Sequence, residues 1–546
     1  MRILFINPNL DTGGYKPLAI SILSAIAKEY GHTVEIFDTS FLNVEDYSFN
    51  KVHVDSQVAG EEVLNFVPVD YSAWNLVEAN VELETVFSKH IRSFAPDLVA
   101  LTIFSQEYAL GMELLKMAKK VDPEVTTIVG GVHCYGDPHG VIANDCVDFL
   151  CLGEGEVLFD KFMKGFDNES INGYEIEGLW WKNQNGEVKQ SEVGPYTKLD
   201  TTPYLNYDEY DDRLFCRAFN GNMYRSADYV LTRGCFERCT YCLFDKMYNT
   251  YGDSKSIRKY SIDRSISELE HLIKKHNLDF IRFHDADLMH VNPKYLKEYA
   301  TEYVRQIGLP FVLDATPQMV SKEKVRYLKE MNCQSISVGL ETGNEDLRIN
   351  TLNKKATNRH IIDAFHIINS FDIRTVSFIL LGFPFETRQY YYETIELIRE
   401  ARVAAPTVGF VYPFKGSVLR DTSIRDGYFD PVIEINGAPQ YARNYPIINN
   451  PAITVEEYKG LYRTFMFYCK FPKSYYSDIR IAEQLDEVGN RMYTKLKNEF
   501  EDSQLFNSLA ADLPVPPDPS ETPDPLADPA LATNAESTPV TLGKRS

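Results

Sequence analysis

Two series of short apolar segments, each alternating with amphipathic segments, limit the possible folds of this chain more than any other feature. The strand-like members of the first series are residues 3–8, 33–38, 97–104, 126–131 and 147–153. Helical periodicity separates them, as at 18–31 and 108–121. Alternating strands and helices predict an α/β fold with a parallel, doubly wound sheet.

The second series begins at a strand-like segment that ends in a cysteine. Its members are residues 228–235, 280–288, 310–317, 335–343, 374–384 and 405–414. Segments with helical periodicity lie between them, as at 265–277 and 322–332. We therefore expect a partial (β/α)6 barrel whose chemistry lies at the carboxyl ends of its strands.

These patterns divide the chain into five parts. Residues 41–80 interrupt the first alternation and are treated as an insertion, and 178–190 is typical of a β-hairpin with an Asn-Gly turn. A helical, aromatic-rich segment follows the barrel, and the Pro-rich end of the chain is predicted to be disordered. The predicted parts are 1–165 (first sheet), 166–227 (linker with hairpin), 228–430 (barrel), 431–511 (helical segment) and 512–546 (tail).

Charge and cysteine content exclude some classes of function. The net charge of -22 repels phosphate backbones, and the sequence has no basic run, so nucleic acid is not an expected partner. No segment approaches the roughly 20 apolar residues of a membrane span, and the first residues lack the apolar region of a signal peptide. Nine cysteines, an odd number with one tight cluster, suit the reducing cytoplasm and favour metal binding over disulfides.

The cysteine cluster has the spacing C-x3-C-x2-C, formed by Cys235, Cys239 and Cys242. Three thiolates on one loop can hold three irons of a [4Fe–4S] cube. The fourth iron then has no protein ligand, and the amino and carboxylate groups of S-adenosylmethionine (SAM) suit it. The alternative is a structural zinc site, which needs four ligands and could recruit only Cys216 nearby.

Beyond this spacing, residues 225–430 resemble the radical SAM superfamily. Tyr241 matches an aromatic residue that in the family lies against adenine, and 338–343 resembles the G-x-E-[ST]-G strand end, whose acid is Glu341. Gly382 and Pro384 resemble the G-x-P segment that approaches adenine by its backbone. The resemblance implies that these residues bind SAM. Thr316 departs from the family pattern, because an Arg usually lies there.

Residues 1–165 resemble the cobalamin-binding domains that are fused to radical enzymes. The resemblance is carried by Asn7-Pro8, by 96–102, by the run Gly130-Gly131-Val132-His133 and by 153–156. An open parallel sheet binds ligands in the loops beyond its carboxyl ends, which here also include Ser105. The predicted cobalamin-binding residues are therefore Asn7, Ser105, Gly130, Gly131 and His133.

We expect this cobalamin to lack a protein histidine on cobalt. The usual motif is D-x-H-x-x-G, and Asp137-Pro138-His139 begins it in the wrong loop, with Ile142 in place of the glycine. Gly131 is also consistent with a simple tight turn. Glu154 and Glu156 are expected to lie at the start of the next helix, where the helix dipole stabilises their negative charge.

The cofactor pair predicts a radical enzyme that methylates an unactivated carbon of a small metabolite or peptide. Alternatives are a cyclisation or rearrangement with the same cofactors, and a zinc-bearing interaction protein without activity. An external one-electron donor, such as a flavodoxin or ferredoxin, is the expected partner. Asp285 and Asp287 end a barrel strand and suit either ligand binding or helix capping. The sequence assigns no catalytic residue.

Overall fold

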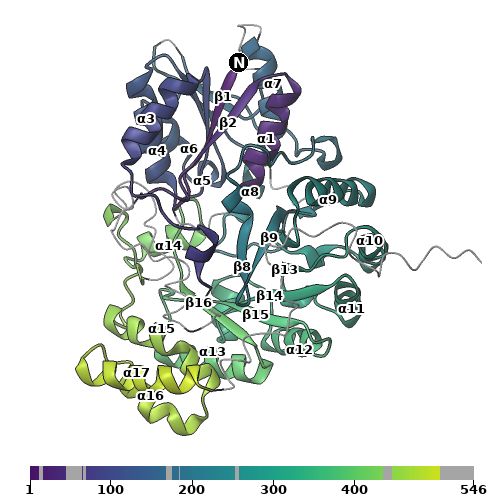
Figure 1. Cartoon of the computed structure of the whole chain (residues 1–546). Helices are drawn as coiled ribbons and strands as arrows, with labels where there is room; N and C mark the ends of the chain where they lie inside the picture. The colour runs from purple at the N-terminus through teal and green to yellow at the C-terminus, as the bar shows by residue number, and fades with distance from the viewer. Residues whose placement is uncertain are drawn as a thin grey trace, which may run out of the picture. The chain divides into compact units, whose positions relative to one another are not determined.

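The first sheet has seven strands in the order β2-β1-β3-β4-β5-β6-β7 (Figure 1). The computed structural model describes residues 1–10, 16–44, 64, 69–167, 175–183, 185–252, 257–433 and 445–503. The strands are β1 (Arg2–Asn7), β2 (Thr33–Asp38), β3 (Leu98–Thr102), β4 (Thr126–Gly130), β5 (Phe149–Cys151), β6 (Leu179–Lys182) and β7 (Val188–Gln190). The pairs among β1 to β5 are parallel, as predicted.

Helices cover both faces of this sheet. Successive side chains of β1 point to opposite faces and therefore pack against different helices. Ile3 and Phe5 pack in one core with α1 and α7, whereas Leu4 and Ile6 pack in a second core with α3 and α4. The sheet is therefore doubly wound, as predicted. The helices are α1 (Leu18–Glu29), α3 (Leu83–Phe94), α4 (Tyr108–Val121), α5 (Val132–Gly136), α6 (Pro138–Ile142) and α7 (Gly155–Asp167).

The second sheet has the order β16-β15-β14-β13-β12-β9-β8 and is open, since its two edge strands are not neighbours. Six of its strands are parallel and β8 is antiparallel to β9, so the partial (β/α)6 barrel is confirmed. The strands are β8 (Cys216–Phe219), β9 (Asn222–Tyr229), β12 (Phe280–Phe283), β13 (Phe311–Ala315), β14 (Cys333–Glu341), β15 (Arg374–Leu381) and β16 (Ala405–Phe410). A separate two-stranded ribbon pairs β10 (Thr232–Arg233) with β11 (Arg258–Lys259).

Helices follow the barrel strands, and Figure 1 shows α9 to α12 along the outer side of the second sheet. The helices are α8 (Phe244–Thr250), α9 (Ile262–His276), α10 (Pro293–Gln306), α11 (Lys322–Glu330), α12 (Asn358–Asn369), α13 (Arg388–Ala401) and α14 (Val418–Arg425). Apolar residues on their inner faces join the core of the sheet, among them Leu269, Leu296 and Phe365.

The segment 166–227, which we predicted to be a linker with a hairpin, contributes strands to both sheets. The predicted hairpin at 178–190 forms as β6 and β7, and β6 pairs with β5 at the edge of the first sheet. β8 and most of β9 extend the second sheet on the other side. The segment therefore supplies the edge strands β7 and β8 of the two sheets.

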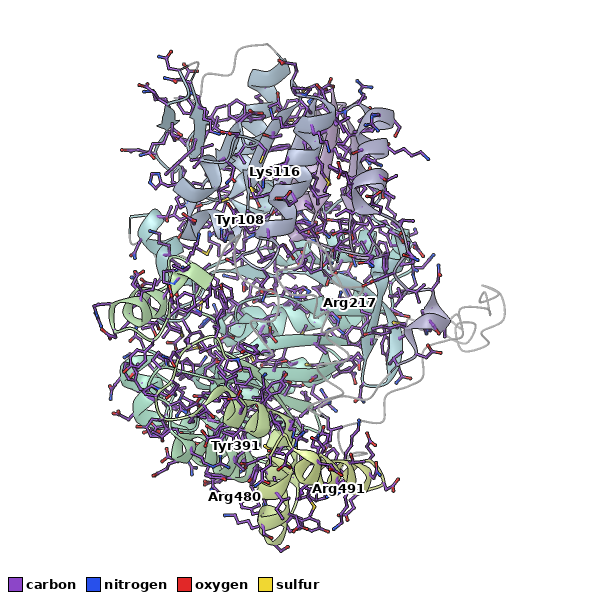
Figure 2. The ribbon with its side chains drawn as sticks, turned by 90° about the vertical axis from the view of Figure 1, so that its left-hand side faces the viewer. Tyr108, Lys116, Arg217, Tyr391, Arg480 and Arg491 are labelled. Atoms are coloured by element: carbon purple, nitrogen blue, oxygen red, sulfur yellow. The ribbon has the colours of Figure 1, made fainter. Side chains whose placement is uncertain are left out.

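Three C-terminal helices pack against the barrel, namely α15 (Val455–Lys470), α16 (Tyr476–Ala482) and α17 (Glu487–Glu501). Their aromatic side chains are largely buried, and Tyr391 of α13, labelled in Figure 2, lies near these helices. Its ring is edge-on to those of Phe465 and Tyr468 of α15. These aromatic residues therefore serve the packing of the helices. No described helix is long and apolar enough to cross a membrane. The predicted disordered tail lies outside the described residues.

Candidate active site

The three clustered cysteines lie on one loop between β10 and α8. Cys235 and Cys239 are buried and Cys242 is half-buried, and none forms a disulfide. The backbone N–H of Cys235 donates to the Tyr248 hydroxyl at 2.7 Å, and that hydroxyl in turn donates to the Cys235 carbonyl. The N–H of Thr240 donates to the Leu352 carbonyl at 3.0 Å. The loop is thus fixed to α8 on one side and to the segment after β14 on the other.

The thiols fit an iron–sulfur cluster better than a single ion. Burial raises the pKa of Cys235 to about 11 and of Cys239 to about 12, so bound iron would be needed to hold them as thiolates. Among the described residues, no three His, Cys, Asp or Glu side chains converge on one metal ion. A cube presents a different iron to each of the three thiolates, so its ligands need not converge.

Cys216, the one candidate for a fourth zinc ligand, lies apart from this loop. It begins β8, in register with Arg225 of β9, and the charges that act on its thiol belong to Arg225, Asp212, Lys16 and Asp279. A closed tetrahedral zinc site is therefore not formed by the described cysteines.

Glu341 lies next to the cysteine loop at the end of β14. Its backbone has φ +66°, a left-handed conformation that costs free energy in a residue other than glycine, and its carboxylate pairs with Lys354 at 3.2 Å. Both side chains are less than one tenth exposed. Their charges act on the thiols of Cys239 and Cys242. Sequence reasoning missed Lys354, which lies in a loop without a motif.

Gly339 makes room for this ion pair. A Cβ atom there would lie 2.6 Å from Oε1 of Glu341 and 2.8 Å from Nζ of Lys354, so any side chain would displace the pair. The strand register shifts between Gly339 and Glu341, which turns the strand end toward the loop. The glycine of the predicted SAM-binding run thus has a steric reason.

Tyr241 and the segment 382–384 meet in a small apolar cluster. The rings of Tyr241 and Phe383 are 6.4 Å apart and edge-on, with Leu352 and Val411 in the same cluster. Gly382 has φ +86°, and its N–H donates to the Glu386 carboxylate at 2.6 Å. The structure therefore brings two of the predicted SAM-binding elements together, while Glu341 lies with the cysteines.

Glu386 joins this segment to the C-terminal helices. Its buried carboxylate accepts a hydrogen bond from the Tyr458 hydroxyl at 3.0 Å, and Asn450 donates to the carbonyls of Phe383 and Glu386. Burial raises the pKa of Glu386 to about 7. The C-terminal segment therefore supports the Gly382 turn from behind.

A cavity of about 520 Å³ opens where the first sheet faces the barrel. We call the apolar part of its lining that comes from the first sheet, α1 and α7 the slot, and the part that comes from the barrel side, including Phe244 and His284, the mouth. The slot is lined by Phe5, Ile20, Leu23, Ala100, Leu158 and Phe159.

The lining fits part of a cobalamin, because the apolar slot can pack against the flat base of the nucleotide tail. Of the five residues predicted to bind this cofactor, Gly130 and Gly131 line the cavity. A Cβ atom on Gly131, which has φ +107°, would lie 2.5 Å from the carbonyl oxygen of Ile103, so close backbone packing already requires glycine there.

The other three predicted residues do not line the cavity. Asn7 donates to Asp38 at 2.5 Å. Ser105 and His133 are both buried and share a hydrogen bond of 2.9 Å, and burial lowers the pKa of His133 to about 4. The side chains of Asn7, Ser105 and His133 thus bond within the first sheet domain, and their roles toward cobalamin stay predictions.

A buried ion pair joins the loop after β1 to the first barrel strand. Lys16 lies 3.0 Å from Asp228, and both side chains are fully buried. Lys16 also donates to the carbonyls of Leu214 and Ser226. His284, which lines the cavity, lies with Nε2 2.7 Å from Asp228. The Lys16 and His284 contacts hold the pKa of Asp228 well below its usual range despite its burial.

Asp285 and Asp287 act as structural ties between strand ends. Asp285 accepts hydrogen bonds from the N–H groups of Leu231 and Thr232, at 3.1 and 2.5 Å. Asp287 accepts from the N–H of Met289, the capping contact that was one of its two possible roles, and from Thr316. Burial raises the pKa of each to about 6.

Comparison with known proteins agrees with this division of the site. The model of the radical SAM superfamily matches residues 229–398, and that of the B12 binding domain matches 71–162. The cytidylyl-2-hydroxyethylphosphonate methyltransferase of Streptomyces wedmorensis is 23% identical over 480 residues, which cover 79% of this chain and 83% of that protein. The anaerobic magnesium-protoporphyrin IX monomethyl ester cyclase of Cereibacter sphaeroides is 23% identical over 417 residues, which cover 73% of this chain and 59% of that protein.

A solved structure has the same fold. It is the radical S-adenosylmethionine methyltransferase TsrM from Kitasatospora setae, with cobalamin and a [4Fe–4S] cluster bound. It is 15% identical, and the match covers 82% of each chain with a TM-score of 0.58.

The fold and the site define a radical enzyme that combines an iron–sulfur barrel with a cobalamin-binding sheet. The chain carries a radical SAM domain and a B12 binding domain, and it is similar to cobalamin-dependent radical SAM methyltransferases. The predicted cofactors, namely a [4Fe–4S] cluster, SAM and cobalamin, are thereby confirmed as a set.

Proposed function

We propose that this enzyme transfers a methyl group to an unactivated carbon of a small metabolite or peptide. The observation that supports it most directly is the cavity that extends from the first sheet to the β10–β11 ribbon beside the cysteine loop. Its lining includes Gly234, the residue directly before Cys235. A substrate at the cavity mouth would face both cofactor regions, as methyl transfer after hydrogen abstraction requires.

The roles of individual residues follow from their positions. Cys235, Cys239 and Cys242 would hold three irons, and Tyr241, Glu341, Gly382 and Pro384 would hold SAM. When bound, the iron–sulfur cluster and SAM would supply a 5′-deoxyadenosyl radical, and cobalamin would supply the methyl group. The half-buried loop and the apolar slot keep water from the reacting groups.

Isotope labelling tests this proposal. The full chain is reconstituted anaerobically with iron, sulfide and hydroxocobalamin, then given SAM labelled in its methyl group, a reductant and an extract of small molecules. We expect 5′-deoxyadenosine and a labelled product. 5′-Deoxyadenosine with an unlabelled product would instead support a cyclase or rearrangement enzyme, which the cyclase among the relatives also suggests.

The zinc-bearing interaction protein is disfavoured by the match to the radical SAM model. Analysis that finds one zinc and no iron or sulfide after anaerobic purification would revive it. We further infer that a flavodoxin or ferredoxin supplies electrons and that the enzyme acts in the cytoplasm, where its nine free thiols would stay reduced. Nucleic acid is not expected as a substrate, because the net charge is -22.

A further inference from the structure

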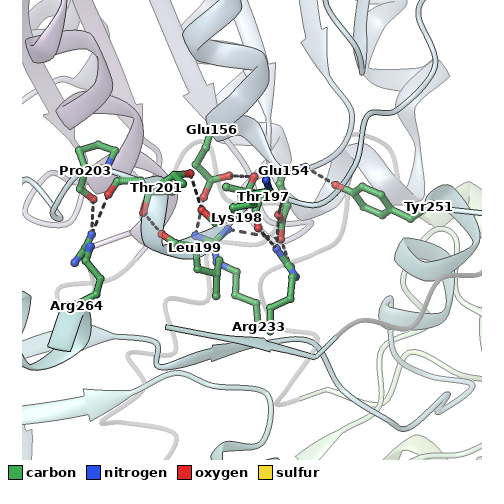
Figure 3. Close-up of polar contacts among 12 residues, drawn as sticks. Glu154, Glu156, Thr197, Lys198, Leu199, Thr201, Pro203, Arg233, Tyr251 and Arg264 are labelled. Atoms are coloured by element: carbon green, nitrogen blue, oxygen red, sulfur yellow. Dashed lines mark hydrogen bonds and ion pairs between the residues drawn. The ribbon is translucent and has the colours of Figure 1, made fainter. Parts of the chain in front are cut away.

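Three ion pairs join Glu154 of the β5–α7 loop and Glu156 at the start of α7 to the β10–β11 ribbon (Figure 3). Arg233 lies 2.6 Å from Glu156 and 3.6 Å from Glu154. The guanidinium of Arg258 donates hydrogen bonds to both carboxylate oxygens of Glu154, at 2.5 and 2.8 Å. The two arginines are paired with one another in the register of the ribbon, so one rigid unit presents both guanidinium groups.

Further contacts fix the same four side chains. The N–H of Thr197 donates to Glu154 at 2.8 Å, and its carbonyl accepts from Arg258 at 2.8 Å. The backbone N–H of Glu154 donates to the Tyr251 hydroxyl at 2.7 Å. Burial would raise the pKa of Glu154, but the Arg258 hydrogen bonds and the charge of Arg233 keep it below its usual range. The side chains are only 10–19% exposed, so the pairs are shielded from salt.

These ion pairs touch both cofactor regions. All four charged residues line the cavity that fits cobalamin. Arg233 is separated from Cys235 only by Gly234, which has φ +113°. A group that fills the cavity mouth therefore contacts the side chains that hold the start of the cysteine loop.

We propose that Arg233 and Arg258, held by Glu154 and Glu156, are positioning residues that couple occupancy of the cobalamin cavity to the geometry of the cluster loop. This inference rests on the proposed function, because it requires both cofactors in one chain. Coupling between two binding sites is reciprocal. If bound cobalamin changes the affinity of the loop for the cluster by some factor, a bound cluster must change the affinity of the cavity for cobalamin by the same factor.

A second ion pair across the same two parts of the chain provides a matched control. Asp137, at the start of α6, lies 2.6 Å from Lys415 in the loop after β16. Neither residue lines the cavity. If the Glu154 and Glu156 pairs only held the two parts together, loss of the Lys415 pair would have the same consequence as loss of the Arg233 pair.

The experiment measures hydroxocobalamin affinity of the full chain by absorption, with and without a reconstituted cluster. For wild type we expect the two dissociation constants to differ by about fivefold or more. Glu156→Gln and Arg233→Gln should bring their ratio to within about twofold of one, with iron content retained. Lys415→Met should keep the wild-type ratio. The EPR spectrum of the reduced cluster should likewise shift on hydroxocobalamin addition in wild type and Lys415→Met only.

A wild-type ratio of one, or an unchanged ratio in Arg233→Gln, would overturn the proposal. If Arg233→Gln loses iron, Glu154→Gln decides, because this residue lies on the first-sheet side of the contact. Arg233→Lys should restore part of the ratio. A wild-type chain that binds no hydroxocobalamin would refute the proposed function instead, so the two failures are distinguishable.

Discussion

The cysteine loop and the cobalamin cavity are built in opposite ways. The loop places its three thiols within eight consecutive residues, 235–242. The cavity takes its walls from β1, α1, β3, β4, the β5–α7 loop and the barrel. Most of the surface that lines the cavity is apolar.

This difference determines how each region responds to substitution. A metal ligand cannot be replaced by its neighbours, because the bond is specific to one sulfur atom. An apolar wall shares its contribution among many side chains, so single truncations have modest effects and only filling the space blocks it. The following changes separate the two regions, from the largest expected effect to the smallest.

Cys239→Ser removes one iron ligand from the buried loop. We expect iron content to fall and 5′-deoxyadenosine formation to drop to background, while absorption still shows hydroxocobalamin binding. Cys216→Ser, on β8, is the matched control and should keep its iron. Equal iron loss in both variants would contradict the assignment of the cluster to the 235–242 loop.

The same contrast explains what could be predicted from the sequence. Cys235, Cys239 and Cys242 could be predicted as cluster ligands from spacing alone, because they lie within one short loop. Lys354 and Arg258 carry no local signal, since each becomes relevant only when the fold brings it to a distant acid. Strand and helix periods, which are local, predicted both sheets, while the pairing of the 178–190 hairpin with β5 depends on tertiary contacts.

Asn7 and Ser105 show the limit of reasoning from topology. Asn7 is the last residue of β1 and Ser105 follows β3, yet their side chains bond to Asp38 of β2 and His133 of α5. The rule for ligand sites selects an edge of the sheet and does not select the direction of each side chain.

Asp228→Asn tests the buried ion pair of Asp228 with Lys16, which joins the loop after β1 to the first barrel strand. The substitution leaves the Lys16 ammonium fully buried without a charged partner, so the free energy of unfolding should fall by about 3–5 kcal/mol. Urea unfolding measures this loss. The double variant Lys16→Met with Asp228→Asn should recover part of it, because no buried charge remains. A loss below about 1 kcal/mol in the single variant would contradict the buried pairing.

Glu386→Gln tests the support behind the predicted SAM segment through pH. Burial raises the pKa of Glu386 to about 7, above its unfolded value near 4.5. Between these two values the folded state keeps a proton that the unfolded state releases, so wild-type stability should fall as pH rises from 4.5 to 7 and then level off.

The Gln variant lacks this titration. The unfolding free energy of the variant minus that of wild type should therefore increase by about 2–3 kcal/mol from pH 4.5 to pH 8. Urea unfolding at several pH values measures the difference, and hydroxocobalamin binding should be unchanged. Parallel pH profiles for the two proteins would contradict a raised pKa at this carboxyl.

Ala100→Phe fills the cobalamin-side slot and gives the smallest effect. Ala100 lies on β3, is 5% exposed and lines the cavity, so a ring there occupies space needed by a ligand. Fitting the ligand beside this ring should cost about 1–3 kcal/mol of binding free energy, so hydroxocobalamin affinity should fall about tenfold or more. Iron content should be unchanged. Val99→Ile is the matched control, because Val99 points to the opposite layer of the sheet. Equal affinities in Ala100→Phe and wild type would place cobalamin outside the slot and leave only the mouth of the cavity for it.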